Sequence, residues 1–223
     1  MMALAFVQSA ASNSSNTIAL TGVGAGNLIV LWAKWEDSAS GGITVSDGTS
    51  SLSLGTLRSP GTTGPRGQFA YLLVANSGNK TYTVTWPSGA LYKRLRIMEF
   101  SYTGTASLDT QNTATGTSNA PLSGNITTTG TDEVILGGYA EYSAYSSSLF
   151  KVNSAAAAGS VGGGATYAAE WYSIFTSTLA NTNAGCTLSG SDGEWVCNVV
   201  AFKAVAAGGG GGFLNRNYWW GNY

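Results

Sequence analysis

Short segments in which apolar and polar residues alternate follow one another along most of the chain, separated by glycine-rich or polar turns. In residues 80–86, Tyr82, Val84 and Trp86 share one side, and the threonines between them share the other. This two-residue period is that of a β-strand with one buried face. Strands at a spacing of roughly 8–12 residues are typical of a sandwich or barrel. No stretch keeps a helical period over three turns, so we predict an all-β antiparallel sandwich.

The order of these segments predicts where the core lies. Residues 26–37 begin as a continuous apolar run, which indicates a central strand buried on both faces. Residues 67–86 read as two strands joined in a hairpin by the four-residue loop 76–79. The polar segment 106–116 predicts an edge strand or a loop. Further strands are expected at 4–10, 16–20, 91–102, 131–145, 165–175 and 193–205. No internal repeat is evident.

Composition supports a folded, weakly charged protein. The chain has 223 residues, of which 43% are hydrophobic, enough for a sizeable core. Charged residues make up 9%, against about 25% in an average soluble protein. The 25 aromatic residues, 7 Trp, 11 Tyr and 7 Phe, argue against disorder. A glycine-rich chain with few charges is typical of extracellular or virion β proteins.

Charge and hydropathy argue against nucleic-acid and membrane partners. The net charge is -1, whereas a nucleic-acid footprint needs a broad basic field. The basic cluster Lys93, Arg94 and Arg96 alternates with apolar residues and is expected on the outer face of a strand. No run approaches the ~18 apolar residues that span a bilayer. The start lacks the basic and apolar regions of a signal peptide, so we expect cytoplasmic assembly or export by another route.

Two cysteines leave two alternatives open. Cys186 and Cys197 flank a turn-rich stretch, so a hairpin would bring them into reach of a disulfide. Two small buried thiols are the other reading. Without histidine, the pair does not make a zinc site.

Enzymatic chemistry has few candidate residues here. Acid–base and nucleophilic catalysis most often use histidine, and the chain has none. Carboxylate pairs, as in glycosidases, remain as candidates. They are Glu36 with Asp37, Asp132 with Glu133, and Asp192 with Glu194, and Glu99, Glu141 and Glu170 lie on strands among apolar residues. We expect the paired acids to form turns or protect strand edges, and a buried acid among Glu99, Glu141 and Glu170 to pair with Lys34 or Lys93. We predict no enzymatic activity and no cofactor.

Calcium is a weaker alternative. Asp37, Asp47 and Asp192 lie in predicted loops, and calcium is bound through loop oxygens. None of these loops has the dense spacing of aspartates that marks a strong site.

The sequence changes character near Ala206. Residues 1–205 are expected to form the sandwich domain, and residues 206–223 a linker and a docking tail. Gly208–Gly212 form the flexible linker. The predicted partner-binding side chains beyond it are Phe213, Leu214, Arg216, Tyr218, Trp219, Trp220 and Tyr223. Such residues are favoured interface anchors; the alternatives are a last strand of the same sandwich and stacking on a sugar.

The succession of weak motifs resembles a known family. The motifs are FVQSAASNSSNTIAL, GNLIVLWAKWED, ITVSDG, FAYLLVANSGNKTYTVTW, YKRLRIMEFSYTGTASLDT, TDEVILGGYAEY and GEWVCNVVAFK. Together they are similar to a domain common in phage structural proteins and in bacterial surface or secreted proteins. The resemblance covers about residues 4–204 and implies a jelly-roll or immunoglobulin-like sandwich, with no shared catalytic residues. The missing signal peptide and the aromatic tail favour the phage branch.

We therefore predict a non-enzymatic virion structural protein, either a capsid-decoration or a tail-associated subunit. Its expected partners are further copies of itself and other virion structural proteins. It would be located in the virion after assembly in the host cytoplasm. The alternative is a carbohydrate-binding or adhesion module on a cell or virion surface, with a surface glycan as partner.

Overall fold

The computed structural model describes residues 4–36, 41–61, 64–142, 146–162, 167–190 and 193–205, which form sixteen strands. All strand pairs are antiparallel, which confirms the predicted all-β sandwich. The first half of the chain contains β1 (Leu4–Ser12), β2 (Thr17–Val23), β3 (Leu28–Glu36), β4 (Thr44–Ser46), β5 (Ser53–Leu54), β6 (Arg66–Leu72), β7 (Gly78–Thr85) and β8 (Leu91–Tyr102). The second half contains β9 (Thr105–Gly116), β10 (Glu133–Glu141), β11 (Ser147–Val152), β12 (Ala155–Ala156), β13 (Gly159–Gly162), β14 (Ala168–Phe175), β15 (Ala184–Leu188) and β16 (Trp195–Val205).

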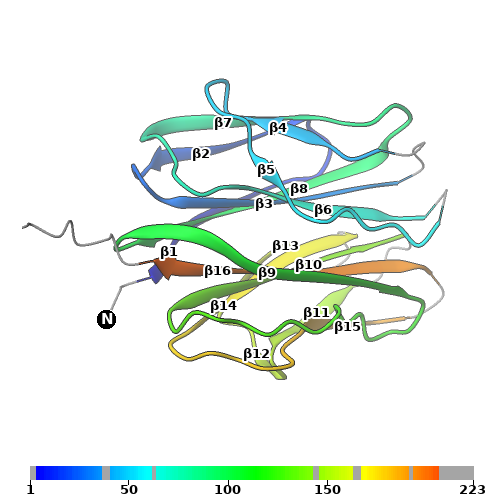
Figure 1. Cartoon of the computed structure of the whole chain (residues 1–223). Helices are drawn as coiled ribbons and strands as arrows, with labels where there is room; N and C mark the ends of the chain where they lie inside the picture. Colours follow the sequence, from blue (N-terminus) through cyan, green and yellow to red (C-terminus); the bar gives the residue numbers. More distant parts are fainter. Residues whose placement is uncertain are drawn as a thin grey trace, which may run out of the picture.

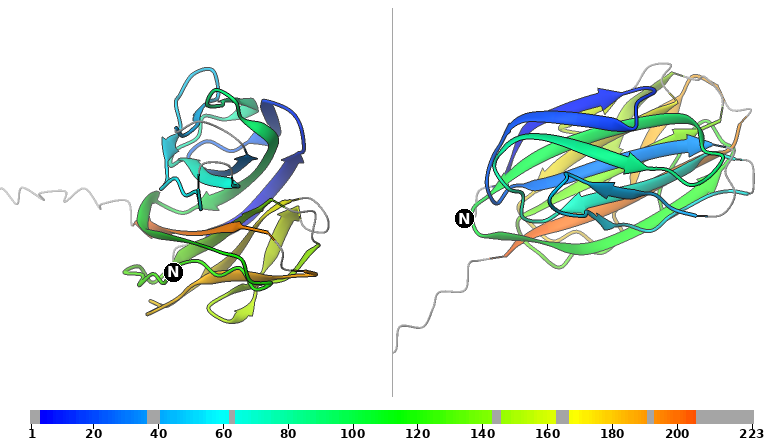
Figure 2. Two further views of the ribbon diagram at one scale, coloured as in Figure 1. Left: turned by 90° about the vertical axis from the view of Figure 1, so that its right-hand side faces the viewer. Right: turned by 90° about the horizontal axis from the view of Figure 1, so that it is seen from above.

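The strands form four sheets stacked as layers (Figure 1). The two inner sheets have five strands each, in the orders β1-β8-β3-β6-β5 and β13-β14-β10-β16-β9. Each outer sheet has three strands, β2-β7-β4 on one side and β12-β11-β15 on the other. Residues 4–102, here the N-terminal unit, supply one inner and one outer sheet, and residues 105–205, the C-terminal unit, supply the other two (Figure 2).

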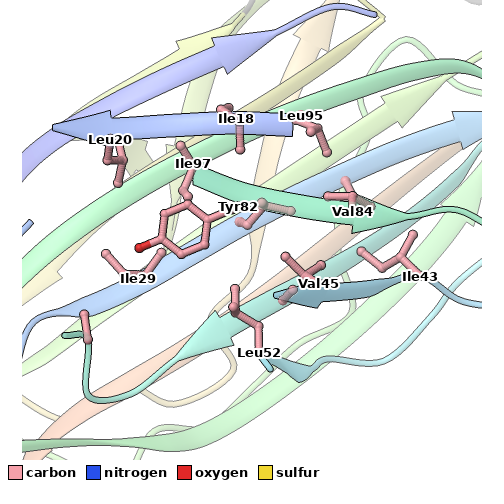
Figure 3. Close-up of a cluster of buried hydrophobic side chains, with 14 of the residues drawn as sticks. Ile18, Leu20, Ile29, Ile43, Val45, Leu52, Tyr82, Val84, Leu95 and Ile97 are labelled. Carbon is pink, nitrogen blue, oxygen red and sulfur yellow. The ribbon is translucent and has the colours of Figure 1, made fainter. Parts of the chain in front are cut away.

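Three apolar cores lie between the four layers. The outer core of the N-terminal unit packs Tyr82 and Val84 of β7 against Ile29, Leu95 and Ile97 of the inner sheet (Figure 3). A second core lies between the two inner sheets, and a third lies between the inner and outer sheets of the C-terminal unit. Every residue of β3 and of β10 is buried, because each of these strands is covered on both faces. The prediction of a doubly buried central strand is therefore confirmed.

The predicted hairpin between β6 and β7 is wrong. β6 pairs with β3 and β5, whereas β7 pairs with β2 and β4 in the outer sheet. The connecting residues cross from one layer to the next. The alternation of β7 was interpreted correctly, with Tyr82 and Val84 buried and Thr81 and Thr83 exposed. The apolar side of β7 packs onto the inner sheet. A hairpin with β6 would have placed β7 within the inner sheet and left the face of that sheet exposed.

The expected position of the basic cluster is also wrong for Arg96. Arg96 is 1% exposed and faces the central core from β8. Its guanidinium donates to Ser12 O at 3.1 Å, Leu95 O at 2.8 Å and Asn13 Oδ1 at 3.0 Å. The alternation in β8 correctly places Arg96 on the face of the sheet that points away from the outer core. That face is buried because the C-terminal unit packs against it.

Candidate functional site

The predicted partner-binding tail follows the last described strand. Phe213, Leu214, Arg216, Tyr218, Trp219, Trp220, Tyr223 and the glycines before them lie outside the described residues. The described chain ends at Val205, which pairs with Thr105 at the start of β9. Leu4 pairs with Tyr102 at the end of β8, two residues before β9. The start of β1 and the end of β16 therefore lie at the same end of the molecule.

The outer edge of β1 is the candidate functional surface. β1 is an end strand of its sheet and pairs with β8 on one side only, within the described part of the chain. Its nine residues are mostly apolar, and Phe6 is 37% and Val7 45% exposed. An unpaired strand of this kind presents free backbone groups to another chain. Sequence reasoning overlooked it, although the adjacent apolar residues Phe6 and Val7 break the alternation as a bulge does.

The other edges of the two inner sheets are short or protected, whereas β2 is a seven-residue end strand of an outer sheet and contacts β1. β5 has two residues and β13 has four. β9 is long but polar, which confirms the edge strand predicted at 106–116. Its bulge holds Asp109, which accepts hydrogen bonds from Lys203 Nζ at 2.8 Å and Thr129 N at 2.6 Å. Such contacts and charges discourage edge-to-edge pairing.

Asp109 also contacts Glu133, one of the acids singled out in the sequence, so that these two carboxyl groups form a pair. Glu133 pairs with Asp109 rather than with its neighbour Asp132, and it accepts a hydrogen bond from Gly130 N at 2.6 Å. Burial and the contact with Asp109 raise the pKa of Glu133 to about 7. Hydrogen bonds from Lys203 and Thr129 lower the pKa of Asp109 to about 2, against the opposing effect of burial. Glu133 is 1% exposed, so this pair belongs to the interior.

Two other predicted acids, Glu99 and Glu36, contact neighbouring polar side chains. Glu99 accepts hydrogen bonds from Gln8 Nε2 and Asn27 Nδ2, both at 2.6 Å. Glu36 forms a buried ion pair with Lys34. Burial lowers the pKa of Lys34 to about 8, although Glu36 favours its charged form. The pairing with Lys34 is predicted for Glu99, Glu141 or Glu170, but Glu36 forms the ion pair, and Glu141 also acts on Lys34 electrostatically.

Several predicted residues are not placed, and others are placed away from any site. Asp37 and Asp192 lie outside the described residues. Asp47 accepts hydrogen bonds from Thr49 N and Ser50 N at 2.9 and 2.6 Å, which closes the predicted turn at Gly48. No group of three or more potential metal ligands gathers in the described ranges.

The cysteines are free and buried. Cys197 is fully buried, and its thiol donates to Ala184 O at 3.4 Å. Burial raises the pKa of both thiols well above the usual range. Cys186 lines a pocket of about 260 Å³ on the outer sheet of the C-terminal unit, beside Lys151 and Asn183. A thiol with a raised pKa is a poor nucleophile.

Fold and surface together define an antiparallel β-sandwich protein in which β1 is a long, mostly apolar edge strand of an inner sheet. No protein-family model and no curated protein matches the chain. No helix among the described residues has the length and apolar character needed to cross a membrane.

Proposed function

We propose that the protein is a non-enzymatic structural subunit of a virion, in capsid decoration or associated with the tail, that assembles through its sandwich edges and its aromatic C-terminal tail. The observation that carries this proposal is the unpaired β1 edge, where Phe6 and Val7 are exposed. Natural sandwiches usually protect a strand of this length and character. An apolar edge left open is a site for strand addition by another chain.

The position of the tail supports the same proposal. The chain leaves β16 at the end of the molecule where β1 begins. Seven residues, 206–212, precede the aromatic segment and span at most about 25 Å when extended. An aromatic segment on such a tether can reach the β1 edge of a neighbouring subunit.

The alternative, a carbohydrate-binding or adhesion module, has less support on the described surface. Sugar-binding faces present exposed aromatic rings for stacking. Trp32, Trp35, Trp171 and Trp195 are all buried. Among the described residues the exposed aromatic rings are those of Phe6, Tyr92 and Tyr142, and Phe6 already packs against the rings of Phe100 and Tyr172.

A charged side chain introduced on the β1 edge tests this proposal. Val7→Lys places a cation on the exposed bulge and blocks strand addition. We expect light scattering after size-exclusion chromatography to give a smaller assembly mass and an unchanged melting temperature. Leu149→Lys is the matched control, because Leu149 is 65% exposed on the opposite outer sheet. Equal assembly masses for both variants would contradict a role for the edge, and binding to a glycan by the unassembled variant would favour adhesion.

A further inference from the structure

The two inner sheets have the same strand order. Starting from the first strand of each unit, the N-terminal sheet runs β1-β8-β3-β6-β5 and the C-terminal sheet runs β9-β16-β10-β14-β13. In both, the first strand of the unit pairs with the last strand, which pairs with the first fully buried strand. Each unit then adds a three-stranded outer sheet. The two units therefore share the topology of their inner sheets, whereas their outer sheets have different strand orders, β2-β7-β4 and β12-β11-β15.

An irregularity of the backbone is repeated as well. The bulge in β1 falls between Phe6 and Gln8, directly after the pair Phe6–Phe100. The bulge in β9 follows the pair Leu108–Phe202 in the same way. A bulge at one register position is a specific feature of a strand pair. Its recurrence aligns the units residue by residue, with Phe100 equivalent to Phe202.

The contacts between the units obey an internal two-fold relation. Tyr71 of β6 packs against Phe202 of β16, with ring centroids 5.1 Å apart and planes at 66°. The equivalent Tyr172 of β14 packs against Phe100 of β8, at 5.2 Å and 78°. The strand contacts follow the same rule, because β8 meets β14, β6 meets β16, and β3 meets β10. Exchanging the units leaves this pattern unchanged, as in an isologous dimer.

One row of residues breaks the symmetry. In the N-terminal unit, Trp32 pairs with Phe69 on one side and Arg96 on the other. In the C-terminal unit the equivalent row is Gly138 between Glu170 and Asn198.

Trp32 occupies the space that Gly138 leaves open. A Cβ atom on Gly138 would lie 2.5 Å from Trp32 Cδ2. The indole Nε1 donates to Tyr139 O at 3.0 Å, across the interface between the units. Two copies of the N-terminal face would place Trp32 against a second Trp32, with no glycine to receive it.

The charges in this row are complementary across the interface. Glu170 is 0% exposed, and neither carboxylate oxygen has a hydrogen-bond partner. Burial raises the pKa of Glu170 well above its usual range, and the guanidinium of Arg96 opposes this shift. Two N-terminal faces would instead set Arg96 opposite Phe69, and two C-terminal faces would set Glu170 opposite Asn198. The first arrangement leaves the buried Arg96 cation without an acidic group opposite it, which is destabilising.

We propose that the chain is a fused dimer of two β-sandwich units with equivalent inner sheets, and that its central face binds only the opposite unit, because Trp32 requires Gly138. The partner that fits each central face is therefore a unit of the other kind, and never its own copy. This inference is independent of the proposed virion function.

A permuted chain tests the two-fold relation. Thr103 and Gly104 connect the end of β8 to the start of β9. The two-fold relation places the end of β16, at Val205, equally close to the start of β1, at Leu4. A chain in the order 105–205, a linker of about four residues and 4–102 should therefore fold. We expect its melting temperature to lie within about 5 °C of that of the unpermuted chain 4–205. An unfolded permutant would overturn the two-fold relation.

A second variant tests the specificity. Gly138→Trp combined with Glu170→Phe and Asn198→Arg gives the C-terminal face the row of the N-terminal face. We expect a melting temperature lower by at least about 10 °C, or no folded protein. Gly61→Trp is the control, because nothing lies within 4 Å of a Cβ atom at Gly61. A triple variant as stable as this control would overturn the claim that the row determines which faces pair.

Discussion

Individual buried charges are the unusual feature of this chain at the residue scale. Arg96 and Glu170 face each other between the inner sheets, and Lys34 pairs with Glu36 at the end of β3. Burial lowers the pKa of Arg96 to about 10, so it remains protonated at neutral pH. Buried ion pairs contribute little net stability, but breaking one is costly. Their best-supported role here is to determine which faces can pack together.

The face assignment of β7 can be tested at single residues. Val84 is 2% exposed in the outer core of the N-terminal unit, and the adjacent Thr83 is exposed. Val84→Asp should lower the free energy of unfolding by about 3 kcal/mol or more, because the charge is buried without a partner. Thr83→Asp should change it by less than about 1 kcal/mol. Similar denaturant midpoints for the two variants would contradict the assignment.

Glu133 makes stability depend on pH. Its pKa rises from 4.5 to about 7 on folding, so the folded protein holds a proton that the unfolded chain releases between these values. Stability should therefore fall as pH rises through this window. Glu133→Gln keeps the acceptor for Gly130 N and removes the titration, so its melting temperature should fall less between about pH 5 and about pH 8. The exposed Glu194→Gln is the control, and an unchanged slope in Glu133→Gln would contradict the prediction.

At the scale of strands, alternation in the sequence predicted the existence and facing of most elements. β3, β7, β10, β14 and β16 all lie where apolar patterns placed them. Pairing was not predictable in the same way. Alternation shows which side of a strand is apolar, but it does not show which strands pair with it or which layer covers each face. For that reason β6 and β7 were joined in a hairpin, and the covering of Arg96 was overlooked.

The duplication escaped sequence reasoning for a related reason. Equivalent positions share size and hydrophobicity in the symmetric part of the interface, as do Phe100 and Phe202. In the asymmetric row they are opposites, with Trp32 equivalent to Gly138. Two faces of the same shape pack closely only if a large residue on one meets a small residue on the other. Equivalent positions at the interface therefore differ in sequence, which hides the relation between the two units. The shared bulges and strand order become visible only from the pairing register.

For the candidate site, the sequence identified the tail and overlooked the edge. An aromatic segment after a glycine linker is recognisable from composition alone. The accessibility of β1 depends on which strand ends the sheet, and topology decides that. The prediction of tail docking stays a prediction, because residues 206–223 lie outside the described part of the chain.

At the scale of the whole molecule, the two units pack on each other through the central core, and β1 is a long, mostly apolar edge strand. Each unit has its own outer core, and the shared central core holds them together. The core side chains that the structure describes all belong to residues 18–202. Assembly and folding should therefore be separable in this protein, with the tail and β1 serving assembly.

The most direct test of this account is the mass of the full-length protein and of a chain ending at Val205, measured by light scattering after size-exclusion chromatography. The account predicts that the full-length protein exceeds the 22.8 kDa of one chain, and that the shortened chain is monomeric with an unchanged melting temperature. Trp219→Ala with Trp220→Ala should reproduce most of this loss, since burying each aromatic contributes roughly 2 kcal/mol or more. An unchanged mass after truncation, or a collapse of the monomer's own stability, would contradict the account.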